Sequence, residues 1–111
     1  MIYVHCMNLQ NYWFQYIRDG SKKYEGRVYD EKRQKIQIND SIIFTNEHNH
    51  KIIRVVKNIH LFSSFEEMID NLGLNLLLPE VSSKEEALSI YNSIPLYESK
   101  SKIYGVIAIE F

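Results

Sequence analysis

The apolar run at residues 102–111, KIYGVIAIEF, is the feature that most constrains how this chain can fold. In an extended strand neighbouring side chains point to opposite faces, so a run that is apolar at nearly every position has two apolar faces. A strand of this kind belongs in the interior of a sheet, with other layers covering both of its faces. Residues 102–111 therefore predict a central strand that is buried on both sides.

The other periodic segments supply the elements that surround this strand. The stretches SFEE at 64–67 and SKEE at 83–86 are capping boxes, and Gly20 is placed to end an earlier helix. The predicted order is β-α-β-β-β-α-α-β. We expect strands at residues 2–7, 22–30, 41–45, 51–62 (one long strand or two) and 102–111, and helices at 9–19, 64–72 and 83–94.

This order indicates an α+β fold. Few strands with one helix inserted early predict a small, strongly curved and mostly antiparallel sheet of about five to six strands. Such a sheet would be partly closed into a barrel, with the helices packed outside it. Because 111 residues is the size of one domain, we expect a single domain over residues 1–111.

The first strand and the first helix carry apolar residues that predict which of their faces are buried. Both faces of residues 2–7 are largely apolar, which predicts a strand inside its sheet with Cys6 in the core. Phe14 lies outside the apolar stripe of the helix at about 100° per residue. The stripe that we expect to enter the core consists of Leu9, Tyr12, Trp13, Tyr16 and Ile17.

The composition excludes several classes of protein. Hydrophobic residues make up 45% of the chain and charged residues 24%, as in a soluble globular protein, and the formal net charge is -1. A polybasic protein that coats nucleic acid needs a large excess of positive charge, so that class is excluded. No segment approaches the ~20 apolar residues of a membrane span, and no signal segment is evident. A single cysteine forms no internal disulfide, and we expect a cytosolic or nuclear protein.

The near-neutral total conceals an uneven distribution of charge along the chain. Residues 1–57 contain ten basic and six acidic side chains, whereas residues 58–111 contain three basic and eight acidic ones. This asymmetry is consistent with a basic face in the first half. The alternative is that the charged side chains of both halves intermix on ordinary solvated surfaces.

Residues 20–27, GSKKYEGR, concentrate the side chains that could bind a ligand. In an extended strand Lys23, Glu25 and Arg27 share one face, and Lys22 lies where the chain leaves the helix. Gly26 has no side chain, so a ligand could approach the backbone there. Two cations and a carboxylate beside a glycine would suit an anionic or amide-bearing ligand. The alternative is an edge strand whose charges only prevent aggregation.

The pattern G-x-K-x-x-E-x-R, formed by Gly20, Lys22, Glu25 and Arg27, resembles the signature of the ASCH domain, a relative of the PUA RNA-binding module. The turn and strand at 38–44 resemble the Gly-Asp turn of that family before a hydrophobic strand, with asparagine in place of the glycine. The segments at 64–68, 78–79, 85–88 and 104–106 also match, so the resemblance covers essentially the whole chain.

This resemblance implies a small PUA-like β-barrel with flanking helices and a cleft beside the motif, where proteins of this class engage RNA or modified nucleosides. Lys22, Lys23, Tyr24, Glu25 and Arg27 would then contact an RNA or nucleotide ligand. The cations would contact phosphate or base edges, the carboxylate an exocyclic amine, and an aromatic ring would stack on a base. No cofactor and no metal is expected.

A hydrolase is the alternative that the resemblance implies. Small bacterial relatives hydrolyse the amide of acetylated cytidine, with a lysine at the position of Lys22 and a nucleophilic threonine at the position of Glu25. A carboxylate in place of that threonine can act as a general base on water. Lys22 and Glu25 are therefore the candidate catalytic pair, and cleavage of RNA by a ribonuclease activity is a further alternative.

The remaining candidates are four histidines and one apolar loop. His48 and His50 fall in a polar turn, where we expect solvated side chains rather than metal ligands, whereas His5 and His60 fall in apolar strands and should be hydrogen-bonded. The leucine-rich loop at 74–78 is expected to plug one end of the core. The alternative for this loop is a contact with a protein partner or a second copy of the chain.

Overall fold

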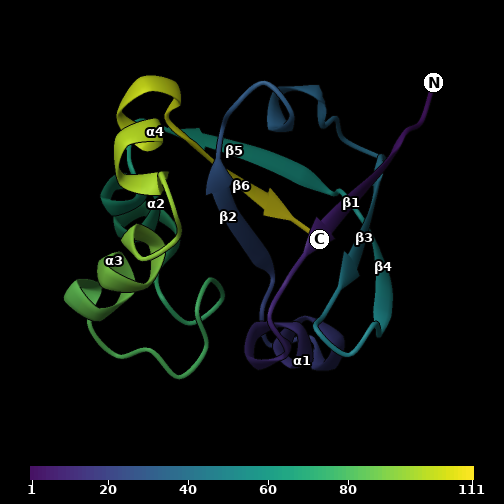
Figure 1. The fold of residues 1–111 in the computed structure, drawn as a ribbon, viewed down its shortest axis with the longest axis horizontal. Helices are drawn as coiled ribbons and strands as arrows, with labels where there is room; N and C mark the ends of the chain where they lie inside the picture. The colour runs from purple at the N-terminus through teal and green to yellow at the C-terminus, as the bar shows by residue number, and fades with distance from the viewer.

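A computed structural model describes residues 1–111 as six strands and four α-helices, which confirms the α+β class (Figure 1). None of the helices has the length and apolar content that crossing a bilayer requires. A single 3₁₀ turn, η1, covers Arg33–Lys35. The strands are β1 (Val4–Asn8), β2 (Tyr24–Val28), β3 (Ser41–Thr45), β4 (Lys51–Val55), β5 (Asn58–Phe62) and β6 (Val106–Glu110), and the helices are α1 (Asn11–Asp19), α2 (Phe65–Leu72), α3 (Lys84–Asn92) and α4 (Tyr97–Tyr104).

The strands form two sheets of three, with the orders β1-β3-β4 and β2-β6-β5. In the first sheet β1 runs parallel to β3, and in the second both neighbours of β6 are antiparallel to it. Ala108 pairs with Gly26 of β2 on one side and with His60 of β5 on the other. The central position predicted for the last strand is therefore confirmed.

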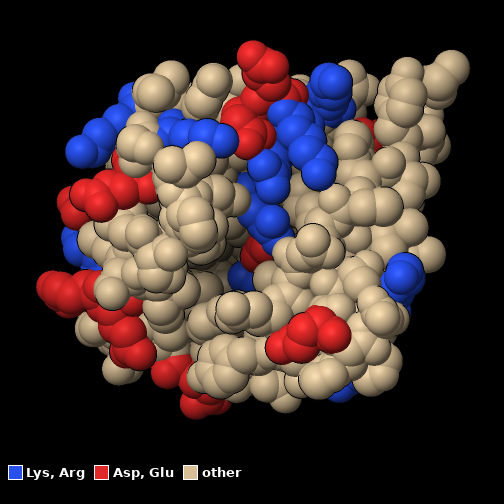
Figure 2. Space-filling view, viewed as in Figure 1, with Lys and Arg blue, Asp and Glu red and all other residues tan.

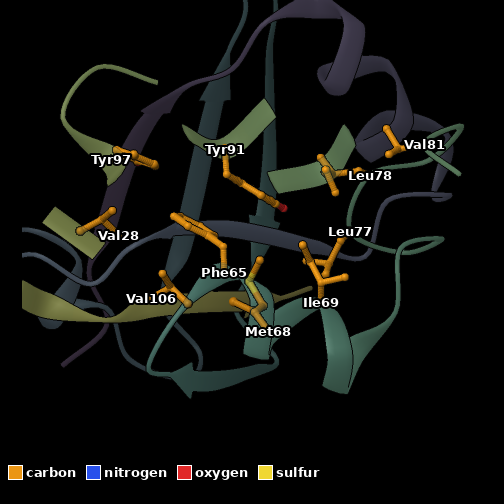
Figure 3. Packing of buried hydrophobic residues seen from close by; sticks show 12 residues of the cluster. Val28, Phe65, Met68, Ile69, Leu77, Leu78, Val81, Tyr91, Tyr97 and Val106 are labelled. Atoms are coloured by element: carbon orange, nitrogen blue, oxygen red, sulfur yellow. The ribbon is translucent and has the colours of Figure 1, made fainter. Parts of the chain in front are cut away.

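Two apolar clusters cover the two faces of β6, as expected for a strand with two apolar faces. Ile107 and Ile109 face the space between the sheets, where α1 also packs, whereas Val106 and Ala108 face the helices α2, α3 and α4. Figure 3 shows side chains of this second group, which we call the helix-side cluster. The helix-side cluster consists of Val28, Phe65, Met68, Ile69, Leu77, Leu78, Val81, Ala87, Tyr91, Tyr97, Val106 and Ala108.

The helix ends follow the sequence signals. Ser64 and Ser83 accept hydrogen bonds from the backbone N–H groups three residues later, which confirms both serines as the N-caps of their helices. Gly20 ends α1 in the left-handed conformation at φ 89°, where a side chain would be strained. Residues 51–62 form two strands, β4 and β5, and β4 pairs antiparallel with β3.

The predicted element order omitted α4, and the closing strand begins at Val106 rather than at residue 102. α4 is rich in serine and lysine, and its Ile103 is 73% exposed. The helix therefore has no apolar stripe from which it could be predicted. Gly105 separates α4 from β6 at φ 72°, and a Cβ there would lie only 2.8 Å from the Phe62 carbonyl oxygen. Strand pairing leaves two separate sheets, and no closed barrel is found.

The expectations for β1 and α1 were wrong in detail. β1 is an edge strand, and Cys6 is exposed on it because no layer covers that face of the sheet. Helix α1 turns a narrower face to the sheets than its apolar residues indicate: Phe14 is 1% exposed and Tyr12 is 50% exposed. Residues three apart lie on the same face of an α-helix, and the two buried residues of α1 are Phe14 and Ile17.

Candidate functional site

A cavity of about 260 Å³ lies along the free edge of β2. Four groups of residues form its walls: Asn8, Leu9, Gln10 and Trp13 around the start of α1; Lys22 with Glu25, Gly26 and Arg27 of β2; Leu78; and Ile90, Tyr91, Ser93, Ile94 and Tyr97 from the end of α3 to the start of α4. Figure 2 shows this face hollowed between the helices and the strands, with Lys and Arg side chains gathered along the hollow. We call this hollow the β2 cavity.

A buried group of three charges forms one wall of the β2 cavity. Oε1 of Glu25 lies 3.2 Å from Nζ of Lys22. Oε2 of Glu25 lies 2.9 Å from Nε and 2.7 Å from Nη2 of Arg27. Lys22 is 2% exposed and Glu25 is 5% exposed. We call these three residues the charged triad. Charges of both signs at this depth are stable only when each is paired and hydrogen-bonded.

Lys22 is turned inward by the end of α1. Its backbone N–H donates to the Tyr16 carbonyl, just past the left-handed Gly20. Its ammonium group donates to the Leu77 carbonyl and lies 6.0 Å from the centre of the Trp13 ring. A carboxylate, a carbonyl and an aromatic face are all favourable neighbours of a cation.

Burial and pairing shift the pKa values of the triad. Burial lowers the pKa of the Lys22 ammonium, and the attraction of Glu25 offsets only part of this effect. Burial alone would raise the pKa of the Glu25 carboxyl, but the neighbouring Arg27 and Lys22 outweigh it and lower that pKa. Glu25 therefore remains a carboxylate at neutral pH, and Lys22 releases its proton more readily than a solvated lysine.

Arg27 joins two walls of the cavity. Its Nη2 donates to the Asn8 carbonyl at 2.7 Å, immediately before α1, while Nε and Nη2 donate to Glu25. The guanidinium also interacts with Tyr97 of α4. This planar group with several donors can hold the walls together and still present an N–H to a bound ligand.

The backbone of Gly26 offers an unpaired edge to the cavity. Hydrogen-bonded pairs alternate along an antiparallel ladder. The Lys23 carbonyl accepts from Phe111 and the Tyr29 N–H donates to Gly105, so the odd-numbered residues of β2 bond to β6. The N–H and C=O of Gly26 therefore point away from β6, and Gly26 lines the cavity. β2 has no second neighbour in the sheet to occupy them.

The hydroxyl of Tyr91 in α3 is buried and has no hydrogen-bond partner. Its ring stacks on Phe65 within the helix-side cluster, with the ring centres 4.4 Å apart (Figure 3). The hydroxyl lies 3.1 Å from the point that a Cβ on Gly26 would occupy. Burial, with the nearby Glu25 carboxylate, raises its pKa, so the group is a neutral hydroxyl.

The structure brings three of the five sequence-predicted site residues together. Lys22, Glu25 and Arg27 line the β2 cavity, but Lys23 is exposed and lies beside a separate shallow pocket. β2 begins only at Tyr24, so the alternation of strand faces does not extend back to Lys23. The ring of Tyr24 points to the other face of the strand, 5.7 Å from the ring of His60.

Sequence reasoning missed the aromatic and helical parts of the site. Trp13 was expected in the core, but it is half-buried and lines the cavity. Tyr91 is buried in α3, and no sequence signal indicates that its hydroxyl lacks a partner. Tyr97 reaches the site from α4, a helix that has no apolar stripe to reveal it.

The other candidate residues lie outside the cavity. His5 pairs with Asp40 and His60 with Glu110, each at 2.8 Å, which confirms that both histidines are hydrogen-bonded. His48 and His50 are exposed in the turn before β4. In the 74–78 loop Leu77 and Leu78 are buried, which confirms that the loop plugs the core, and Leu76 is 41% exposed.

Comparison with known proteins agrees with this fold. The family model of the ASCH domain matches residues 7–111. The crystal structure of hypothetical protein PH0355 is similar at a TM-score of 0.87 and 40% identity, covering 98% of this chain and 96% of that chain. The solution NMR structure of Protein PF0455 from Pyrococcus furiosus is similar at a TM-score of 0.78 and 41% identity, covering 96% and 94%.

A search of the curated proteins found no match. The family model nevertheless spans all but the first six residues, and it includes the G-x-K-x-x-E-x-R motif whose three charged residues meet at the β2 cavity. The chain belongs to the ASCH domain family.

Proposed function

We propose that this protein binds RNA or a nucleotide by taking one unpaired base into the β2 cavity, as a single PUA-like domain over residues 1–111. The observation that supports this best is the charged triad, which places donors and an acceptor on the wall of a cavity whose other lining residues are mostly hydrophobic. Ligand pockets of this kind combine apolar walls with a few fixed polar groups.

The size of the β2 cavity supports a base as the occupant. Its volume of about 260 Å³ is close to the lower end of small-molecule pockets, which begin at about 300 Å³. A base-paired duplex is far too large to enter. Trp13 lines the cavity and offers an aromatic surface, and single-stranded bases are commonly recognised by stacking on such rings.

The charge around the cavity supports a phosphate-bearing ligand. Arg27 lies on its wall, and Figure 2 shows further Lys and Arg side chains gathered on the same face. A local cluster of cations attracts phosphate even when the net charge of the whole chain is -1. The binding should therefore depend on salt, with a slope that reflects only a few phosphate contacts.

Binding of short single-stranded RNAs, followed by fluorescence anisotropy at two or more salt concentrations, tests the proposal. Arg27→Ala should weaken binding, because it removes a cation and the donors that hold the cavity walls together. Lys51→Ala, which removes an exposed cation from β4 in the other sheet, is the matched control. Binding that ignores both salt and Arg27→Ala would contradict the proposal.

The lowered pKa of Lys22 supports a second candidate, a hydrolase acting on a modified nucleoside or on RNA. A buried amine that loses its proton more readily can accept one during reaction, and Glu25 can orient or activate water. Acetylated cytidine and single-stranded RNA are the substrates to test. Turnover that Glu25→Gln abolishes while binding is retained would support this candidate, and absence of turnover in the wild-type protein would contradict it.

A further inference from the structure

The Tyr91 hydroxyl is a buried polar group that a ligand could hydrogen-bond. Polar atoms that are buried in a protein nearly always have a hydrogen-bond partner, because leaving them without one is costly. Tyr91 is 3% exposed, its hydroxyl has no partner, and the residue lines the β2 cavity. A ligand in the cavity would supply the partner that the free protein lacks.

Gly26 provides a donor and an acceptor beside that hydroxyl. In an extended residue the N–H and C=O groups point to the same side of the strand, and in Gly26 this side faces away from β6. Peptides that add to a free strand edge bond to such pairs of groups. A flat ring that carries an acceptor next to a donor can bond to the same pair.

The glycine at position 26 keeps the hydroxyl close to this edge. A Cβ there would lie 2.9 Å from Cε of Met68 and 3.1 Å from the Tyr91 hydroxyl oxygen, so any side chain would displace them. The backbone edge and the hydroxyl therefore form one compact set of three hydrogen-bonding groups. The wall formed by the charged triad lies on the opposite face of β2, because Glu25 and Arg27 alternate with Gly26.

We propose that Gly26 and Tyr91 bind the Watson–Crick edge of a nucleobase, and that Tyr91 is a specificity-determining residue of the cavity. On all four bases this edge places a donor next to an acceptor, whereas the major-groove edge does so within one base only in adenine. The inference rests on the proposed function and narrows it: the base must be unpaired, since pairing occupies the edge that the protein reads.

Calorimetric or fluorescence binding of the four ribonucleosides tests this inference. Uridine and guanosine are each compared with the counterpart in which a methyl group replaces the ring N–H of the Watson–Crick edge, at N3 in uridine and at N1 in guanosine, because these two bases stay neutral when methylated. We expect the methyl group to weaken binding by tenfold or more, as about 1.4 kcal/mol per lost contact corresponds to tenfold. Methylation of uridine at C5, on the other edge of the ring, should leave binding unchanged.

Tyr91→Phe keeps the ring that stacks on Phe65 and removes only the hydroxyl. We expect roughly tenfold weaker binding of the same nucleoside. The melting temperature of the free protein should stay the same or rise, because an unsatisfied polar group has been removed. If Tyr91 were purely structural, Tyr91→Phe would lower the melting temperature and leave nucleoside binding unchanged. Tyr104→Phe, on the outer part of α4, is the matched control and should change neither quantity.

The outcomes separate the inference from the function beneath it. If nucleosides bind but the ring-methylated forms bind equally well, or if Tyr91→Phe binds like the wild-type protein, the edge recognition is wrong and the nucleotide-binding function stands. If no ribonucleoside and no single-stranded RNA binds to the wild-type protein, the proposed function is wrong and the inference falls with it.

Discussion

Two carboxylates of this protein are almost equally buried and are held in opposite ways. Asp40 is 1% exposed and accepts hydrogen bonds from the backbone N–H groups of Tyr3 and Gln37 and from the ring of His5. Glu25 is 5% exposed and is held by the side chains of Lys22 and Arg27. Asp40 lies outside the β2 cavity, whereas Glu25 lines it.

The difference distinguishes a structural carboxylate from one that can serve a ligand. Backbone amides cannot move away from Asp40 without unfolding the turn that precedes β3, so this group holds β1 against that turn. Lysine and arginine side chains have more than one donor each and can share them with a ligand. The burial of a charge therefore says little about its role, and the kind of partner says much more.

The largest effect is expected from Glu25→Gln, which leaves Lys22 and Arg27 buried without a counter-charge. Removing one member of a buried ion pair costs about 3–5 kcal/mol of unfolding free energy, because the remaining charge is uncompensated. Urea unfolding followed by the fluorescence of Trp13, the single tryptophan, measures this loss. Glu31→Gln, on an exposed loop, is the control. Equal stability of the two variants would show that the triad is not held by its charges.

A smaller effect is expected from Asp40→Asn. The amide keeps one acceptor oxygen but turns its NH₂ group toward a backbone N–H, so at least one of the hydrogen bonds from Tyr3 and Gln37 is lost. The expected loss of unfolding free energy is about 2 kcal/mol. Nucleoside affinity of the folded variant should be unchanged. Weaker binding would mean that the turn shapes the cavity and that the two carboxylates are less distinct than their partners indicate.

Arg27→Lys changes one of the two partners of Glu25 and keeps the positive charge. A lysine cannot donate to Glu25 and to the Asn8 carbonyl with the geometry of the guanidinium. We expect the unfolding free energy to fall by about 1–2 kcal/mol and ligand binding to weaken further than stability alone would require. Arg18→Lys, on the exposed side of α1, is the control. A variant with full affinity would show that charge alone is sufficient at position 27.

The smallest effect is expected in acid, where protonation of Glu25 and of Asp40 each lowers the unfolding free energy. The folded-state pKa of both Glu25 and Asp40 is lowered, so the stability that they provide is present above about pH 4 and is lost as the pH falls through the folded-state values. Unfolding curves between pH 7 and pH 2 should fall for the wild-type protein. Glu25→Gln and Asp40→Asn should each remove part of this fall. A slope identical to that of the wild-type protein would contradict the assignment for that residue.

The sequence predicts those parts of the fold that depend on local pattern. β6 follows from an unbroken apolar run, and α2 and α3 follow from serines with acidic residues three positions later. α4 could not be predicted in the same way, since its polar sequence packs only through Tyr97. Tyr12 and Phe14 exchanged their expected environments because the helix packs along one edge.

The candidate site was predicted in its chemistry but not in its geometry. The motif placed Lys22, Glu25 and Arg27 close together, and they do meet. The inward turn of Lys22 depends on the Leu77 carbonyl, 55 residues away in the sequence. Trp13 and Tyr91 complete the cavity, but in the sequence they read as ordinary apolar positions of a helix. Only the packed structure shows that both residues line the cavity and that the Tyr91 hydroxyl has no hydrogen-bond partner.

The central place of β6 also has a consequence for how the chain is made. β2 and β5 do not pair with each other and are joined only through β6, which lies almost 80 residues after β2 in the sequence. During translation the ribosome must therefore have passed residue 110 and released it from the exit tunnel before this sheet can form. Until then β2 lacks its only neighbour in the sheet, and the charged triad on this strand cannot take its buried arrangement.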